Sequence, residues 1–331
     1  MTITEAHAPG ADGDATSHRP MLVRQMRLEA DNVVSIELAD PTGDALPAWV
    51  PGSHVEVRLP SGLLRQYSLC GPLDEPGSYR IAVLREDTGR GGSLEIHDQV
   101  RVGAQVEVSR PRDLFRVPDA AGYLCLAGGI GVTPILPVVA RAMAVGVPVR
   151  VVYGGRTASA MAFVDELVDS LGDQLTLVPQ DEQGIPDFGS LLDDLPEGWV
   201  VCACGPGAML EAVEAACATR GLQGRLSMER FSAVTGDIDE SLVNAPITVE
   251  LVRSGRTVEV PADQSILDTI KDDAPVVYSC QEGYCGTCEV RVLGGLPDHR
   301  DTVLTDEERE GNESMMICVS RAKDGLLRLD L

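Results

Sequence analysis

The sequence predicts a multidomain α/β and β protein, with an antiparallel β-barrel, a parallel α/β domain and a small C-terminal domain. The chain has 331 residues, which is too long for one ordinary hydrophobic core. The spacing of its apolar residues changes along the chain, from short strands between turns to strands that alternate with helices. Its nine cysteines are unevenly distributed, and three of them lie within nine residues near the C-terminus. These observations indicate three units of different architecture.

Residues 21–118 are predicted to form the barrel. Runs such as Val33–Leu38, His54–Leu59 and Tyr79–Leu84 are apolar or alternate apolar with polar residues, and Pro- and Gly-containing turns separate them. Short strands at regular spacing are typical of a small antiparallel barrel. Residues 1–20 have no apolar core, so we expect a flexible polar arm there.

Residues 119–231 are predicted to form the parallel α/β domain. Apolar runs alternate here with helical stretches such as Thr133–Ala144 and Met209–Arg220, which is the pattern of βαβ units. The apolar runs are Tyr123–Ala127, Val149–Tyr153, Leu175–Val178 and Trp199–Ala203.

A polar linker is expected over residues 232–245, followed by a third domain over residues 246–331. This last domain should begin with two strands around the Ser254–Gly255 turn, and a helix should follow near Ser265–Asp272. A loop rich in cysteine comes next.

The cysteines of this loop have the spacing of an iron–sulfur site. Cys280, Cys285 and Cys288 follow the pattern C-x4-C-x2-C, and Cys318 stands alone downstream. This is the plant-type ligand spacing for two irons and two bridging sulfides. The alternative is zinc, but structural zinc sites usually bring two paired C-x2-C or His motifs, and only one such pair is present.

Two glycine-containing turns follow predicted parallel strands. Gly129 and Gly131 lie between an apolar strand and a helix, where a pyrophosphate can approach the positive helix end. Cys204, Gly205 and Pro206 form a second such turn. One glycine turn alone is weak evidence, because many α/β proteins have one for packing. Two on the same edge of a sheet favour nucleotide binding.

The barrel segment carries a second group of candidate residues. Arg65, Gln66, Tyr67 and Ser68 combine a cation, an aromatic ring and a hydroxyl, which suit a phosphate, a flavin ring and its polar edge. Residues 89–93, with sequence GRGGS, suit a backbone nest for a terminal phosphate. Taken alone, the same residues also fit a half-buried strand and an ordinary hairpin loop.

Together these parts resemble the phthalate dioxygenase reductase family, which belongs to the ferredoxin–NADP reductase-like flavoproteins. The likeness covers residues 21–331 and rests on the order of the motifs. The tyrosine–serine motif, the loop at 89–93, the two glycine turns and the cysteine loop occur in the family's order. So do Glu229 and Phe231, and the segment Pro297–Asp301.

The resemblance implies an FMN-binding barrel, a Rossmann-like NAD domain and a β-grasp ferredoxin domain with a 2Fe-2S cluster. The implied FMN contacts are Arg65, Gln66, Tyr67, Ser68, Ala82, Val83, Leu84, Gly91, Gly92, Ser93, Thr133 and Phe231. The expected NAD contacts are Gly129, Gly131, Asp181, Cys204, Gly205 and Pro206, with Cys204 near the nicotinamide. Two positions depart from the family pattern. Leu84 stands where relatives carry Lys, and Ser227 stands where a His often precedes Glu229, so no side-chain role is expected at either.

The expected reaction follows from electron counting. A nicotinamide gives two electrons as a hydride, a 2Fe-2S cluster takes one at a time, and a flavin does both. The flavin therefore belongs between NADH and the cluster, and the cluster passes electrons to an external acceptor. No side-chain nucleophile or general base is required.

The preferred nucleotide is NADH and the preferred flavin is FMN. Asp181 follows the third parallel strand, where a carboxylate suits ribose hydroxyls and repels a 2′-phosphate. Arg156 weakens this preference, because an Arg accepts such a phosphate. FMN is preferred over FAD because the loop at 89–93 suits a terminal phosphate.

The preferred partner is an oxygenase component, either a Rieske-type aromatic-ring dioxygenase or an O-demethylase, with a cytochrome P450 as the second choice. A stand-alone quinone or ferric reductase and a zinc-stabilised binding module are the alternatives. A net charge of −24 argues against a nucleic-acid partner. We expect no membrane span, because Pro and Arg interrupt the longest apolar region. Nine cysteines without an export signal indicate a reducing compartment, and the expected location is the cytoplasm.

Overall fold

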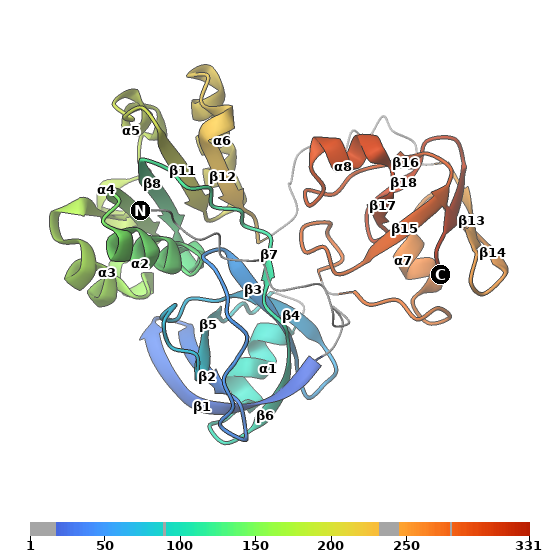
Figure 1. The fold of residues 1–331 in the computed structure, drawn as a ribbon, viewed down its shortest axis with the longest axis horizontal. Helices are drawn as coiled ribbons and strands as arrows, with labels where there is room; N and C mark the ends of the chain where they lie inside the picture. Colours follow the sequence, from blue (N-terminus) through green and yellow to red (C-terminus); the bar gives the residue numbers. More distant parts are fainter. Residues whose placement is uncertain (1–17, 89–90, 232–244, 279) are drawn as a thin grey trace, which may run out of the picture.

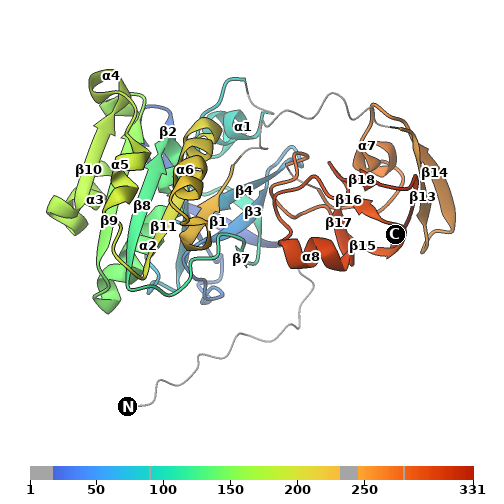
Figure 2. The same ribbon diagram turned by 90° about the horizontal axis from the view of Figure 1, so that it is seen from above.

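The computed structural model describes residues 18–88, 91–231, 245–278 and 280–331. They form a barrel, a parallel-sheet domain and a C-terminal domain (Figure 1). The parallel sheet and the C-terminal domain lie on opposite sides of strands β3, β4 and β7 of the barrel (Figure 2). Most of the predicted arm and linker, and two residues of the predicted 89–93 loop, lie outside the described residues.

An antiparallel sheet of seven strands curls into the barrel. Its order is β4-β3-β6-β1-β2-β5, and β7 pairs with β3. The bounds are β1 His18–Ala30, β2 Val33–Ala39, β3 Ser53–Arg58, β4 Leu64–Ser68, β5 Ser78–Leu84, β6 Gln105–Ser109, β7 Arg112–Asp113 and helix α1 Gly92–Gln99. Val55, Val57 and Ile81 belong to its core. Because side chains alternate along a strand, the residues between them face outward.

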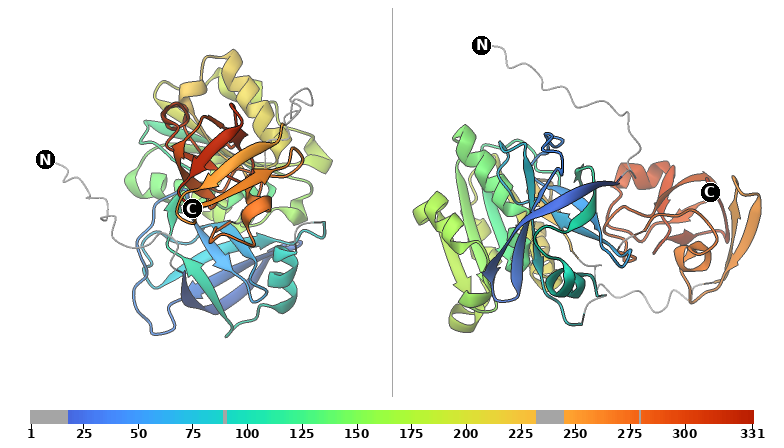
Figure 3. Two further views of the ribbon diagram at one scale, coloured as in Figure 1. Left: turned by 90° about the vertical axis from the view of Figure 1, so that its right-hand side faces the viewer. Right: turned by 90° about the horizontal axis from the view of Figure 1, so that it is seen from below.

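Strand β1 begins at His18, three residues before the predicted start of the barrel at residue 21. Residues 18–20 pair with β6, with His18 opposite Ser109. Backbone pairing rather than apolar side chains extends the strand, so hydrophobic periodicity did not reveal it. β1, in dark blue, crosses the barrel, and its first residues point toward the C-terminal domain (Figure 3).

The second domain is a five-stranded parallel sheet of order β10-β9-β8-β11-β12, with helices on both faces. Its strands are β8 Gly122–Gly128, β9 Val149–Gly155, β10 Leu175–Pro179, β11 Trp199–Cys204 and β12 Leu226–Glu229. Its helices are α2 Ile135–Val145, α3 Val164–Leu171, α4 Gln180–Gln183, α5 Phe188–Asp193 and α6 Gly207–Thr219. The side chains of α2 and α3 share one core, and those of α5 and α6 share the other.

The strand order reverses at β8. From β8 the chain moves outward through β9 and β10, and then returns to place β11 on the other side of β8. In parallel sheets, ligands bind at the carboxyl ends of strands where the order reverses in this way. The turns that follow β8 and β11 therefore flank the expected binding crevice.

The C-terminal domain is a mixed sheet that holds a short helix against one face. The sheet order is β14-β13-β19-β15-β17, and β16 pairs separately with β18. The elements are β13 Ile247–Leu251, β14 Arg256–Val260, α7 Ile266–Ile270, β15 Glu289–Gly294, β16 Pro297–Asp298, α8 Asp306–Gly311, β17 Ser314–Met316, β18 Arg321–Ala322 and β19 Leu326–Leu329. Three α7 residues, Ile266, Leu267 and Ile270, enter a core made of this domain alone. The predicted strands and helix are thus confirmed. None of the helices in the described part of the chain has the length and apolarity that a bilayer crossing demands.

Candidate functional site

A cavity of about 690 Å³ lies where the three domains meet, and all three contribute to its walls. Its size is in the range of small-molecule and cofactor sites, roughly 300–1,000 Å³. Ten of the twelve predicted flavin contacts line it: Arg65, Gln66, Tyr67, Ser68, Ala82, Leu84, Gly92, Ser93, Thr133 and Phe231. Residues that are far apart in the sequence therefore converge on one site.

Two predicted flavin contacts lie elsewhere. The side chain of Val83 is 1% exposed and belongs to the barrel core, because alternation along β5 turns it away from Ala82 and Leu84. Gly91 caps the N-terminus of α1 and does not line the cavity. Its φ of 83° is in the left-handed region that favours glycine, so its role is in the turn.

The end of the cavity near α1 suits a phosphate. Arg65 crosses the first turn of α1 so closely that a Cβ at position 92 would lie 2.5 Å from its Nε. The free N–H groups of a helix N-terminus attract anions, and a guanidinium adds a full positive charge. The hydroxyl of Ser93 accepts a hydrogen bond from the Glu86 amide at 3.1 Å, which ties the helix start to the loop after β5.

The two glycine turns pack directly against each other at the carboxyl ends of β8 and β11. A Cβ at Gly131 would lie 2.5 Å from the carbonyl carbon of Cys204 and 2.7 Å from the Gly205 nitrogen. A Cβ at position 128 would lie 2.7 Å from Pro206 Cδ. Glycine is therefore required for packing between the turns as well as for open space in the crevice.

The remaining predicted nucleotide contacts are dispersed. Gly129 has a φ of 54° at the start of the turn after β8. Cys204 is fully buried at the end of β11, does not line the cavity, and has a pKa raised well above its usual value by burial and by Glu229. Asp181 is exposed on α4, beyond the edge strand β10, and its amide donates to the carbonyl of Arg156 at 3.2 Å.

Two residues of the cavity wall that were not among the predicted contacts, His54 and Glu229, have strongly shifted pKa values. Glu229 ends β12, and its carboxylate accepts a hydrogen bond from Ser68 at 3.1 Å. Burial, with a smaller contribution from Arg112, lowers the pKa of His54 to about 3, so its imidazole is neutral. His54 lies opposite Ser68 in the β3–β4 pairing. The alternation of β3 marks His54 as a residue facing away from the barrel core, but the sequence does not show what faces it.

Glu229 is expected to make stability depend on pH. Burial raises the pKa of its carboxyl from 4.5 to about 8, against the effect of the Ser68 hydrogen bond. The folded state thus retains a proton that the unfolded chain releases, so this contribution to stability is complete below pH 4.5 and is lost as the pH rises through about 8. In flavin-free protein, Glu229→Gln should flatten the fall in unfolding free energy across this window. Glu211→Gln, at an exposed position of α6, is the control. An unchanged pH profile in Glu229→Gln would contradict the assignment.

The cysteine loop, residues 280–288, brings the four predicted ligands together. Cys280, Cys285, Cys288 and Cys318 are all buried and unpaired as disulfides. The thiols of Cys280 and Cys285 interact, those of Cys288 and Cys318 interact, and Cys280 also reaches Cys318. Backbone amides point at the sulfurs, from Glu282 to Cys280 at 3.3 Å and from Cys280 to Cys285 at 3.4 Å. Such donors favour thiolates.

The two interacting thiol pairs fit the four-cysteine ligand set of a 2Fe-2S cluster. A binuclear cluster needs two thiolates on each iron, and the Cys280–Cys285 and Cys288–Cys318 pairs would supply them. Cys280 and Cys285 also line the cavity, whereas Cys288 and Cys318 lie in the C-terminal core. The first pair is thus the side of the site that faces the barrel.

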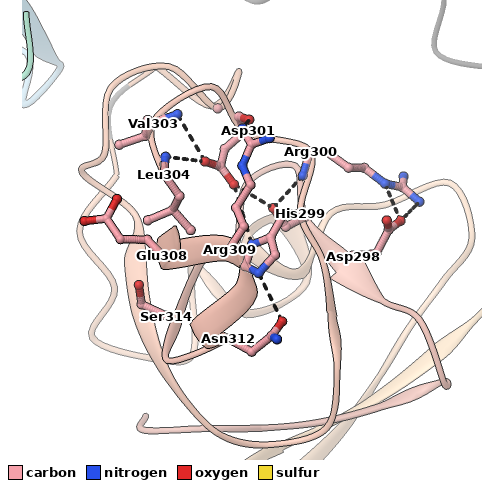
Figure 4. Close-up of polar contacts among 12 residues, drawn as sticks. Asp298, His299, Arg300, Asp301, Val303, Leu304, Glu308, Arg309, Asn312 and Ser314 are labelled. Carbon is pink, nitrogen blue, oxygen red and sulfur yellow. Dashed lines mark hydrogen bonds and ion pairs between the residues drawn. The ribbon is translucent and has the colours of Figure 1, made fainter. Parts of the chain in front are cut away.

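The segment after β16 is held by polar contacts among its own residues and with α8 (Figure 4), and it also bonds to the cysteine loop. The Asp301 carboxylate accepts hydrogen bonds from the amides of Val303 and Leu304 at 3.1 and 2.9 Å. The main-chain carbonyl of Asp301 accepts a hydrogen bond from the Arg309 side chain. Thr302 donates through its amide to the carbonyl of Gly283 at 2.9 Å. Asp301 therefore fixes a turn that packs against the loop, which gives a structural role to the predicted 297–301 motif.

Comparisons with known proteins agree with this geometry. Residues 249–323 match the family model described as "2Fe-2S iron-sulfur cluster binding domain". The chain is 41% identical to the phenoxybenzoate dioxygenase subunit beta of Ectopseudomonas oleovorans, covering 91% of this chain and 94% of the relative. It is 38% identical to the phthalate dioxygenase reductase of Burkholderia cepacia, over the same shares of both chains. This chain belongs to the phthalate dioxygenase reductase family. Its members are electron-transfer oxidoreductases with a flavin, a pyridine nucleotide and a 2Fe-2S cluster, and so is this reductase.

Solved structures show the same arrangement. The reductase matches a phthalate dioxygenase reductase structure, described as modular for electron transfer from pyridine nucleotides to [2Fe-2S], with a TM-score of 0.71 and 36% identity, over 95% of this chain and 98% of that one. It also matches an intact type IV self-sufficient cytochrome P450 monooxygenase with a TM-score of 0.86 and 38% identity. That match covers 98% of this chain but only 43% of the P450 protein.

Proposed function

We propose that this reductase passes electrons from NADH through FMN and the 2Fe-2S cluster to an oxygenase component. The cavity shared by all three domains supports this order more than any other observation. Its walls include Arg65 near α1, Thr133 after the first glycine turn, and Cys280 and Cys285 of the cysteine loop. A flavin in this space would lie between the nucleotide crevice and the nearer pair of cluster ligands.

In this proposal the residues of the chain bind and orient the cofactors, and none acts as a nucleophile. Arg65 and the N-terminus of α1 would hold the phosphate of FMN, while Ser68 and Thr133 would offer hydroxyls to the ring edge. Phe231 would cover the ring and exclude water. A bound flavin supplies the conversion between hydride transfer and single-electron transfer.

FMN is proposed over FAD because the α1 end of the cavity offers a site for a terminal phosphate. Arg65 lies over the first turn of α1, where Gly92 leaves room for it. NADH is proposed over NADPH because Asp181 presents a carboxylate beyond the carboxyl end of the third parallel strand. The Asp181 amide is hydrogen-bonded to the carbonyl of Arg156. Asp181, which favours NADH, therefore lies beside Arg156, the residue that would accept the 2′-phosphate of NADPH.

The proposed acceptor is a Rieske-type aromatic-ring dioxygenase or an O-demethylase. Related chains include a vanillate O-demethylase oxidoreductase and the reductase subunit of a carnitine monooxygenase. A cytochrome P450 is the second candidate, because the fold matches part of a self-sufficient P450 monooxygenase. A cytoplasmic location is proposed from the nine cysteines, all of which are free thiols in the structure.

Cofactor analysis and steady-state kinetics test the proposal. Denaturing the purified protein should release FMN, and iron and sulfide should be present in equal amounts. NADH should be preferred over NADPH in kcat/KM for cytochrome c reduction. Recovery of FAD would contradict the flavin assignment, and comparable kcat/KM values would contradict the nucleotide assignment. A colourless protein containing zinc would overturn the whole function.

A further inference from the structure

A second polar site on the outer face of the barrel joins it to the cysteine loop. Glu56 on β3 and Gln66 on β4 lie directly opposite each other in the antiparallel pairing. Their neighbours Val55 and Val57 belong to the barrel core, so Glu56 and Gln66 point outward. Both reach the same residue of the C-terminal domain, Thr287.

The Thr287 hydroxyl is held from both strands. The Gln66 side-chain amide donates to Thr287 Oγ1 at 2.8 Å and to the carbonyl of Cys285 at 3.0 Å. Thr287 Oγ1 in turn donates to Glu56 Oε2 at 3.0 Å. The hydroxyl thus accepts from one strand and donates its single proton to the other, and its oxygen also lies 3.4 Å from Cys285 Sγ.

Glu56 also has two contacts within the barrel, in addition to its bond with the cysteine loop. Its side chain is almost fully buried, its Oε1 lies 3.1 Å from His18 Nε2, and its Oε2 lies 3.5 Å from Arg112 Nη2. A buried carboxylate is costly unless its oxygens are satisfied. The Thr287 hydroxyl therefore completes the environment of Glu56, and the carboxylate favours one position of the loop.

The flavin cavity and this polar site share one strand face. Ser68, which lines the cavity, lies two residues beyond Gln66 on the same side of β4. Two residues of a strand span roughly 7 Å. The carbonyl of Cys285, a predicted cluster ligand, is thus bonded to Gln66, which itself lines the flavin cavity.

We propose that Glu56, Gln66 and Thr287 form a docking socket that sets the position of the 2Fe-2S cluster relative to the flavin. Glu56 and Thr287 are then positioning residues for electron transfer between the two cofactors within the chain. The predicted effect on electron-transfer rate rests on the proposed function. The contact between the barrel and the cysteine loop does not depend on it.

The test compares Thr287→Val and Thr287→Ser in the full chain with both cofactors bound. Rapid mixing with NADH follows flavin reduction and cluster reduction at separate wavelengths. Thr287→Val should leave flavin reduction unchanged and slow cluster reduction several-fold, since the rate of electron transfer between two cofactors falls steeply as their separation grows. Thr287→Ser keeps the hydroxyl and should restore the rate.

A matched control and a second variant separate the socket from other effects. Thr248→Val removes a threonine–glutamate hydrogen bond of similar length, 2.9 Å to Glu259, in the same domain. It should change neither rate. Glu56→Ala breaks the socket from the barrel side without altering the cysteine loop. It should slow cluster reduction as Thr287→Val does, and the double variant should be no slower than either single one.

Two readouts distinguish positioning from other roles. The midpoint potential of the cluster should be the same in Glu56→Ala, which keeps the 3.4 Å contact between Thr287 Oγ1 and Cys285 Sγ, and in the wild type, and a potential shift large enough to explain the slower rate would overturn the proposal. Amide hydrogen exchange of residues 281–287 should be faster in Thr287→Val and in Glu56→Ala. Wild-type exchange in both variants would overturn the socket even if the protein carried no flavin. Failure of the wild type to reduce its cluster would instead refute the proposed function.

Discussion

Cys285→Ser is expected to abolish electron transfer to protein acceptors while leaving NADH-dependent reduction of ferricyanide intact. Cys285 is one of the two ligands that face the cavity, so its loss should prevent cluster assembly. Cytochrome c reduction should fall by more than the roughly 100-fold loss that follows removal of an outer hydrogen-bond partner of a metal ligand. Ferricyanide takes electrons from the flavin directly, so that activity should remain. Parallel assays with the two acceptors measure the difference.

The barrel and the parallel-sheet domain should survive this substitution. The core of the C-terminal domain contains residues of that domain alone, and the other cores contain none of them. Retained flavin must be verified first, by its absorbance. Cys217→Ser, at a buried cysteine of α6 far from the loop in sequence, is the control and should keep both activities. Equal loss of both activities in a Cys285→Ser protein that retains flavin would contradict the order of carriers.

Gly131→Ala is expected to disable the nucleotide crevice. The new methyl group would lie 2.5 Å from the Cys204 carbonyl carbon and 2.7 Å from the Gly205 nitrogen, and backbone atoms cannot rotate away as a side chain does. The two turns must separate, which we expect to cost about 1–3 kcal/mol of stability. A displacement of this kind should lower kcat/KM for NADH by about 100-fold.

Stopped-flow reduction of the flavin by NADH measures this effect without any contribution from the cluster. Gly224→Ala is the control, because nothing lies within 4 Å of a Cβ at that position. It should reduce its flavin at the wild-type rate. If Gly131→Ala binds NADH normally, the contact between the two turns does not shape the crevice.

The sequence predicted the fold well where a local pattern carries the information. The alternation of apolar and polar residues in β3 and β5 follows from burial on one face of the sheet. The apolar strands between helices in residues 119–231 follow from burial on both faces. The cysteine spacing likewise reflects a loop that must wrap one cluster. Strand β1 was located less well, because its first residues are polar and are ordered by pairing with β6.

The candidate site was less predictable where it depends on contacts between domains. Gln66 lines the cavity as expected, but both hydrogens of its amide go to the cysteine loop, 219 and 221 residues away, which the sequence did not predict. No local pattern encodes a partner at that separation. Val83 was expected at the flavin from the family resemblance, but alternation along β5 places its side chain in the core. The burial of Glu229 depends on Ser68 and the rest of the cavity wall, which a single strand does not reveal.

The parallel pairing of β13 with β19 has a consequence for how such proteins are assembled from modules. It places the first and last strands of the C-terminal domain side by side, and the amide of Arg253 bonds to the carbonyl of the final residue, Leu331. Because the two strands are parallel, the entry and exit of the domain lie at opposite ends of this pair, about one strand length apart. A module whose two ends are this near each other can be moved between proteins or joined to other domains without disturbing its interior. The C-terminal domain therefore has the geometry of a transferable module, and the chain that carries it also matches part of a larger P450 protein.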